Sequence, residues 1–345
     1  MPKKFPKFFF YIFTFSLFFL LFSNPVKAET IYPYWIDENL DVWTKVNLTA
    51  NSNFTLYILK TSGYSPNGDD VFDYFADFES ASSPSDEGII EDTTGWSVVD
   101  SGVSELGKVL QGDPSVPDGE MYCHFGPTMT NYEVRVKIYA PASPARGDVL
   151  GRFVDTDNLI SINWLEDDDQ LNPYKKVSGT WTNLLGSGNH WYTTINAQTT
   201  YIAKLRFLND NVTYIWVNSS GEYVLGSFTV TEMASGGALD DGVGGLRVAP
   251  PTVSGKVWYD EIWMRKYTSP EPSVTIYDEG SYYKVVIEEQ SGSDLTNYQI
   301  KLDGSQLGIS STSESLKISD TPPTENLPPT IEISSPQNTT YYTTS

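Results

Sequence analysis

The chain has 345 residues and a net charge of −22 at pH 7. Hydrophobic residues make up 39% of it, which is too high a content for a wholly disordered protein. The negative charge argues against nucleic-acid binding, because phosphates would be repelled. The single cysteine, Cys123, excludes an intramolecular disulfide framework and a cysteine-rich zinc site.

Residues 1–28 are typical of a secretory signal peptide. Lysines near the start precede an apolar run over residues 8–22, and Val26 and Ala28 have the small-residue spacing of a cleavage site. The run is shorter than the ~20 residues that a membrane-spanning helix needs. Cleavage after Ala28 is therefore favoured over an uncleaved membrane anchor. We predict a secreted or cell-surface protein with no membrane span after cleavage.

Asn-x-Ser/Thr tripeptides agree with an extracellular location, because they are acceptors for N-linked glycans. The alternative is that they arise by chance in a chain rich in Asn and Thr and stay unmodified. The candidate glycosylation sites are Asn47, Asn53, Asn211, Asn218 and Asn338.

Beyond residue 28, apolar and polar residues alternate in several short runs. The clearest runs span 54–58, 132–138, 201–207 and 298–302. A period of two is typical of half-buried antiparallel strands and not of helices. Turn-forming residues separate the runs, for example at 66–68. The predicted fold class is all-β, a two-sheet antiparallel jelly-roll sandwich with small flanking β segments.

Shifts in composition divide the chain into parts. Pro270 and Pro272 mark a boundary, since proline cannot donate a hydrogen bond to a central strand ladder. The end of the chain is rich in Pro, Ser and Thr, which is typical of a linker. The predicted parts are a signal peptide (1–28), an N-terminal β segment (29–70), a jelly-roll domain (71–269), a small β segment (270–319), and a linker or the start of a further β module (320–345).

The central block resembles a concanavalin A-like lectin/glucanase domain of the laminin-G-like group. The stretches that carry the resemblance are FDYFADFE at 72–79 with a following Gly-Trp at 95–96, GRFVDTDNLISINW at 151–164, YKKVSGTWTNLL at 174–185, the paired runs at 200–221, and GVGGLRVAPPTVSGKVWYDEIWMRKY at 242–267. The flanks at 55–72 and 291–302 resemble partial copies of a β domain of unknown function that accompanies such domains in archaeal and bacterial surface proteins. The resemblance implies a jelly roll that binds or cleaves glycans.

Hydrolysis of a glycan requires two carboxylates on either side of the scissile bond. The laminarinase-type members of the group place them on one strand as E-x-D-x-x-E, and this sequence lacks that pattern. It also lacks the G-x-S-x-G, H-E-x-x-H and Walker A motifs. We therefore expect no enzymatic activity, with a glycoside hydrolase as the alternative.

Aromatic residues in the central block suggest a sugar-binding surface. Sugar rings stack their C–H faces on Trp and Tyr, and their hydroxyl groups bond to polar side chains. The alternative is that these aromatics belong to the core, and Trp164 shares its strand parity with Ile160 and Ile162, which favours the core. The candidate carbohydrate-binding residues are Trp164, Trp181, Trp191, Tyr174 and Asn163.

The predicted function is a secreted or surface-exposed, lectin-like module that binds a cell-surface or extracellular polysaccharide without catalysis. The alternative is a structural or adhesive surface or virion protein with no small ligand.

The resemblance also implies one structural calcium ion. Related jelly rolls hold it between the acidic end of the first strand and the acidic start of the last, where Asp77, Glu79 and Asp260 stand in this sequence. Calcium takes six to eight oxygen ligands. The alternative is that these side chains serve turns through their own backbone hydrogen bonds.

Overall fold

The computed structural model describes residues 28–115, 119–250 and 254–323. Strands account for 52% of the structure and helices for 4%, so the predicted all-β sandwich class is confirmed. Within these ranges the strands form four antiparallel sheets. No helix in the same ranges is long and apolar enough to cross a membrane. Residues 1–27 of the predicted signal peptide (1–28) and the tail from 324 onward lie outside the described residues.

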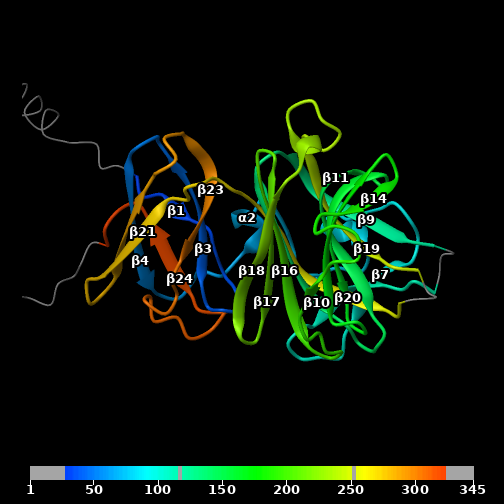
Figure 1. The fold of residues 1–345 in the computed structure, drawn as a ribbon. Coiled ribbons are helices and arrows are strands. Elements are labelled where there is room, and N and C mark those ends of the chain that lie inside the picture. Colours follow the sequence, from blue (N-terminus) through cyan, green and yellow to red (C-terminus); the bar gives the residue numbers. More distant parts are fainter. Residues whose placement is uncertain (1–27, 116–118, 251–253, 324–345) are drawn as a thin grey trace, which may run out of the picture.

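Strands from the two ends of the described chain form one small β sandwich. A five-stranded sheet in the order β1-β24-β4-β22-β21 and a three-stranded sheet in the order β2-β3-β23 share one hydrophobic core. The strands are β1 (Ile31–Tyr32), β2 (Tyr34–Ile36), β3 (Val42–Leu48), β4 (Asn53–Lys60), β21 (Ser273–Asp278), β22 (Tyr283–Glu288), β23 (Leu295–Leu302) and β24 (Leu316–Ser319). The structure thus joins the segments 29–70 and 270–319, which the sequence presents as separate, into one unit (Figure 1).

The chain between these halves forms a larger sandwich of two sheets. The middle sheet, next to the small sandwich, has the order β18-β17-β16-β10-β20-β8-β7, with β5 also paired to β20. Its strands are β5 (Tyr74–Ala76), β7 (Trp96–Asp100), β8 (Lys108–Gly112), β10 (Tyr132–Tyr139), β16 (Thr200–Leu208), β17 (Asn211–Asn218), β18 (Gly221–Thr229) and β20 (Val257–Lys266).

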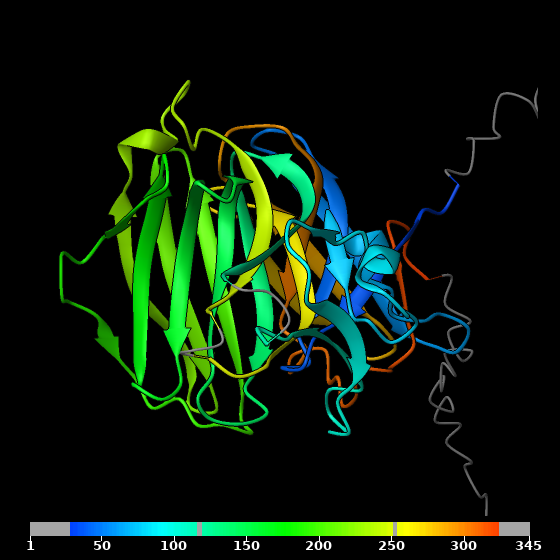
Figure 2. The ribbon, with the colours of Figure 1, turned by 90° about the vertical axis from the view of Figure 1, so that its right-hand side faces the viewer.

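The outer sheet lies on the side away from the small sandwich, and Figure 2 views the molecule from that side. It has the order β14-β13-β12-β11-β19-β9-β6, with β15 also paired to β13. Its strands are β6 (Ile90–Glu91), β9 (Met121–Met129), β11 (Arg146–Asp155), β12 (Asn158–Leu165), β13 (Gln170–Val177), β14 (Thr180–Asn183), β15 (Trp191–Tyr192) and β19 (Gly242–Val248).

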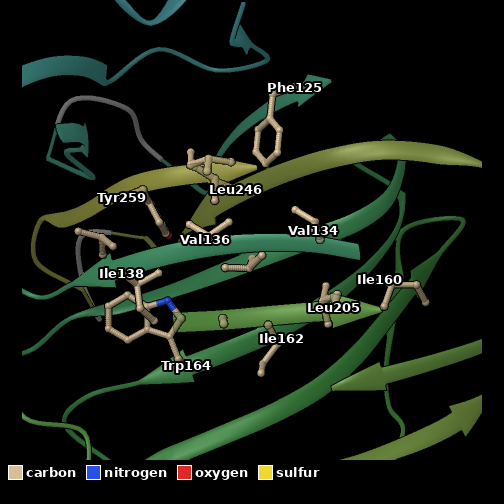
Figure 3. Close-up of a cluster of buried hydrophobic side chains, with 14 of the residues drawn as sticks. Phe125, Val134, Val136, Ile138, Ile160, Ile162, Trp164, Leu205, Leu246 and Tyr259 are labelled. Atoms are coloured by element: carbon tan, nitrogen blue, oxygen red, sulfur yellow. The ribbon is translucent and has the colours of Figure 1, made fainter. Parts of the chain in front are cut away.

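Alternation along the strands builds the core between the middle and outer sheets. Val134, Val136 and Ile138 of β10 face Ile160 and Ile162 of β12, and all five are at most 1% exposed (Figure 3). Each buried apolar side chain of this size contributes roughly 1.5–3 kcal/mol relative to an exposed one. The residues that alternate with them along β10 and β12 point to the opposite faces of the two sheets, so the same alternation fixes which side chains each of those faces presents.

Helices are short in this fold. The turn predicted at 66–68 leads into a one-turn helix, α2 (Gly68–Val71), whose N-cap Asn67 accepts a hydrogen bond from the backbone N–H of Asp69 at 3.1 Å. Two 3₁₀ turns, η1 (Pro84–Glu87) and η2 (Thr231–Met233), complete the helical elements of the described ranges. Asn at an N-cap satisfies a backbone donor that would otherwise lack a partner.

The small sandwich contacts the outward face of the middle sheet. Aromatic rings form one part of the contact: the ring of Trp43 from β3 lies 5.4 Å from that of Trp263 from β20, and Phe72 stacks on Trp263 at 4.8 Å. Buried charge forms another part. Arg265 donates a hydrogen bond to Glu133 of β10 at 3.1 Å and lies over the Trp43 ring, 5.2 Å from its centre. Arg135 of β10 is paired with Glu38 from the turn between β2 and β3. Strands β10 and β20 of the middle sheet are therefore covered on both faces, and the outer sheet keeps one face open to solvent.

Candidate functional site

A ladder of polar side chains crosses the solvent face of the outer sheet. Directly paired positions on neighbouring strands place Asn172 of β13, Asn163 of β12, Asp148 of β11, Arg247 of β19 and Tyr122 of β9 in one row. Directly opposite residues in a sheet point to the same face. Because their chain neighbours Ile162 and Trp164, or Leu246 and Val248, are buried in the core, these side chains face outward.

Asp148 is the centre of this ladder. Its side chain is fully buried beneath its neighbours and accepts hydrogen bonds from the Ser161 hydroxyl group and from Asn163 Nδ2 at 3.3 Å. The guanidinium of Arg247 binds the same carboxylate, with Nη1 2.5 Å from Oδ2. A buried carboxylate with this many donors holds a fixed geometry, because each lost partner would leave a charge uncompensated.

Arg247 also binds a second carboxylate. Its Nη2 lies 2.5 Å from Oε1 of Glu120, which accepts a further hydrogen bond from the Tyr122 hydroxyl group. Burial alone would raise the pKa of Glu120, but the charge of Arg247 lowers it below its usual value. Glu120 is therefore ionised near neutral pH and acts as an acceptor.

Two aromatic rings stand at the side of the ladder. Tyr174 of β13 and Trp181 of β14 meet nearly at right angles, at 79°, with their ring centres 5.7 Å apart. Arg247 and Lys176 lie 5.1 and 5.2 Å from the Trp181 ring, and both also lie within 6.0 Å of the Tyr122 ring. The two cations thus occupy the space between Tyr122 and Trp181, and Tyr174 and Trp181 form an aromatic corner beyond them.

The ladder and the corner enclose a pocket of about 320 Å³. This volume is at the small end of ligand sites in proteins, which fall at roughly 300–1,000 Å³. Apolar walls and a few fixed polar groups are the usual composition of such sites. The lining includes Glu120, Asp148, Asn163, Tyr174, Trp181 and Arg247.

The pocket is the part of the molecule that brings sequence-predicted site residues together. Asn163, Tyr174 and Trp181 all line it, from three adjacent strands. Trp164 does not belong to it, because its side chain is 1% exposed and lies in the core between the sheets (Figure 3). Trp191 is half-buried and packs its ring 5.7 Å from that of Tyr214, so it also faces the sandwich interior.

Other residues of the pocket are missing from the sequence prediction. Asp148 stands between Gly147 and Val149 of β11, Arg247 stands between Leu246 and Val248 of β19, and Glu120 directly precedes β9. Ser161 and Asn163 alternate with core residues in the same way. A single polar residue between two core residues of a strand must point away from the core, and the sequence contains this signal. The signal does not show which strands are neighbours, so it does not bring these residues together into one pocket.

The structure does not gather the three predicted calcium ligands into one group within the described ranges, and calcium binding stays a prediction. Asp260 of β20 is buried in the middle sheet, where Lys137 Nζ lies 3.4 Å from its Oδ2 and burial raises its pKa to about 7. Asp77 instead accepts a hydrogen bond from the backbone N–H of Glu79 at 3.2 Å, as expected of a turn residue. Across the part of the chain that the structure describes, no group of three or more His, Cys, Asp or Glu side chains is arranged to hold a metal ion.

Four of the five candidate glycosylation sites lie on strands. Asn47 of β3 and Asn53 at the start of β4 are exposed, and Asn211 and Asn218 are the first and last residues of β17. Asn338 lies outside the described residues. Their modification stays a prediction.

No protein-family model matches the chain, and no curated protein is similar to it. Solved structures resemble parts of it. The carbohydrate-binding module CBM66 from Bacillus subtilis is 16% identical, with a TM-score of 0.39 over 51% of this chain and 94% of that chain. Galectin LEC-6 from Caenorhabditis elegans is 12% identical, with a TM-score of 0.29 over 39% and 81%. A xylan β-1,4-xylosidase from Bacillus halodurans C-125 is 11% identical, with a TM-score of 0.38 over 71% and 55%. At such low TM-scores these similarities assign no function to the chain.

Proposed function

We propose that the protein is an extracellular, concanavalin A-like module that binds a polysaccharide in the pocket of the outer sheet. The observation that carries this proposal is the aromatic corner of Tyr174 and Trp181 beside a hydrogen-bonded polar ladder. The rings offer flat apolar faces for the C–H side of a sugar. Asn163, Glu120 and Arg247 offer acceptors and donors to its hydroxyl groups. Side chains held by their neighbours lose little freedom when a ligand binds.

The preferred glycan is a neutral one. Arg247 is compensated by two carboxylates, and Arg146 at the edge of the pocket is paired to Asp167 at 2.6 Å and to Asp168 at 3.0 Å. The site thus has no surplus of positive charge for a uronate or sulfate group. The net charge of −22 would in addition repel acidic polysaccharides over longer distances.

The same geometry supports binding without hydrolysis. A glycosidase needs one carboxyl group that stays protonated near neutral pH to act as the general acid. Glu120 has a lowered pKa because of Arg247, and Asp148 is bonded to the same guanidinium. Both carboxylates therefore serve as acceptors and as counter-charges rather than as an acid and nucleophile pair.

A glycan array tests this proposal. The full chain should give signals on neutral glycans and none on glycans that contain uronic acid or sulfate groups. The signals should change little between low and high salt, because screening acts on charge–charge attraction and the expected contacts are stacking and hydrogen bonds. Binding confined to acidic glycans, or an absence of binding to every glycan printed, would contradict the proposal.

A further inference from the structure

Tyr192 is the most exposed of the large apolar side chains in the described ranges, at 74%. It lies on β15, a two-residue strand that pairs with β13 so that Tyr192 is opposite Gln170 and Trp191 is opposite Leu171. Leu171 and Trp191 face the core. Tyr192 and Gln170 must therefore face the solvent side of the outer sheet, which is the face that carries the pocket.

A row of paired residues connects Tyr192 with the pocket. Gln170 of β13 is opposite Leu165 of β12, which is opposite Arg146 of β11. Leu165 and Arg146 both line the pocket. Two strand spacings separate Tyr192 from Leu165, about 10 Å, and four residues along β13 separate its partner Gln170 from Tyr174, about 13 Å. Tyr192 thus stands beside the pocket, beyond the reach of a single sugar unit bound there.

The backbone that carries Tyr192 is fixed on both sides. The preceding Trp191 is anchored against Tyr214, and the following Thr193 donates its backbone N–H to the carbonyl oxygen of Asp169 at 3.0 Å. The ring itself meets that of His190 at 83°, with the ring centres 4.3 Å apart. An aromatic ring that is held in place and left open to water offers a stacking face at a small cost in conformational freedom.

We infer that Tyr192 is a second stacking position for the same ligand, so that the outer sheet binds an oligosaccharide chain running from the pocket over Leu165 and Gln170 to Tyr192. This inference rests on the proposed function. It assigns to the site a neutral glycan of several units rather than a single sugar.

The test is an array of neutral glucan, mannan, galactan, xylan and fructan oligosaccharides, each printed from mono- to hexasaccharide, followed by calorimetric titration of the members that bind. Tyr192→Ala should weaken binding of the longer members at least about tenfold and leave that of the shortest binding member unchanged. Tyr223→Ala is the matched control, because Tyr223 is also exposed, at 45%, but lies on β18 of the middle sheet. It should bind like the wild type at every length.

Each result separates this inference from the function on which it rests. If the wild type binds and Tyr192→Ala has the same affinity at every length, the inference of a second stacking position at Tyr192 is wrong, and the proposed binding in the pocket is unaffected. If Tyr192→Ala weakens the shortest and longest members equally, Tyr192 belongs to the pocket itself and the chain-length inference is overturned. If the wild type binds nothing on the array, the proposed function and this inference both fail.

Discussion

Replacing Glu133 by Ala should lower the free energy of unfolding by about 3–5 kcal/mol, which is the usual cost of removing one partner from a buried ion pair. Glu133 is 1% exposed and holds Arg206 and Arg265 on the two neighbouring strands. Arg265 also lies over the Trp43 ring of the small sandwich, 5.2 Å from its centre. Without the carboxylate, two guanidinium groups would remain close together at the contact between the two sandwiches.

Chemical unfolding at neutral pH measures this effect, and Glu222→Ala is the matched control. Glu222 pairs with Lys204 on the same sheet, but its side chain is 45% exposed, so its loss should cost no more than about 1 kcal/mol. A Glu133→Ala variant that is no less stable than Glu222→Ala would show that the buried network contributes nothing to the fold.

The wild type and Glu133→Ala should differ less in stability at acidic pH. Burial would raise the pKa of Glu133, but Arg265 and Arg206 hold it at about 2, below the value of about 4.3 expected in the unfolded chain. A group with a lowered pKa stabilises the fold above the unfolded value, and this stability is lost as the pH falls toward the folded value. The difference in the free energy of unfolding between the wild type and Glu133→Ala should therefore shrink as the pH falls from about 5 to about 2, the range that contains the two pKa values.

Replacing Trp181 by Ala should weaken glycan binding by about 30-fold or more, as removal of a central aromatic contact commonly does. The substitution removes one wall of the pocket and the ring that Arg247 and Lys176 contact. Isothermal titration with a glycan that binds the wild type measures the change.

Trp164→Ala provides the contrast to Trp181→Ala. Trp164 lies in the core, so its replacement should cost about 3–5 kcal/mol of stability. Trp181 is half-buried at the sheet surface, so its replacement should cost clearly less stability. If Trp181→Ala keeps full binding, or loses binding only because it unfolds as readily as Trp164→Ala, Trp181 is not part of the binding surface.

Local patterns were sufficient to predict four of the strands, β4, β10, β16 and β23. The alternating runs at 132–138 and 201–207 lie within β10 and β16. A one-residue shift would move every apolar side chain of such a strand to the other face of the sheet, so the alternation specifies which residues face the core. Parity also favoured the core for Trp164, which shares a face with Ile160 and Ile162. Information of this kind lies within a few residues of the chain, so one sequence suffices to recover it.

Such patterns could not predict which strands, far apart in the chain, lie next to each other in a sheet. Asp148 and Arg247 are separated by 99 positions in the chain, and their pairing depends on β11 and β19 being neighbours. Pairing of β4 with β22 likewise joins the two ends of the described chain into one sandwich. Alternation shows that a residue points away from the core, but it does not show which residues of other strands it meets.

Hydroxyl-radical footprinting with a neutral polysaccharide that binds the full chain tests the central claim most directly. Bound polysaccharide should protect Trp181 and Tyr174, the aromatic corner of the pocket, from oxidation. Tyr223 on β18 and Tyr277 on β21 are exposed at 45% and 48% and should be oxidised equally with and without the polysaccharide. Protection of Tyr223 or Tyr277, with Trp181 and Tyr174 unchanged, would place the ligand elsewhere and contradict binding at the outer sheet.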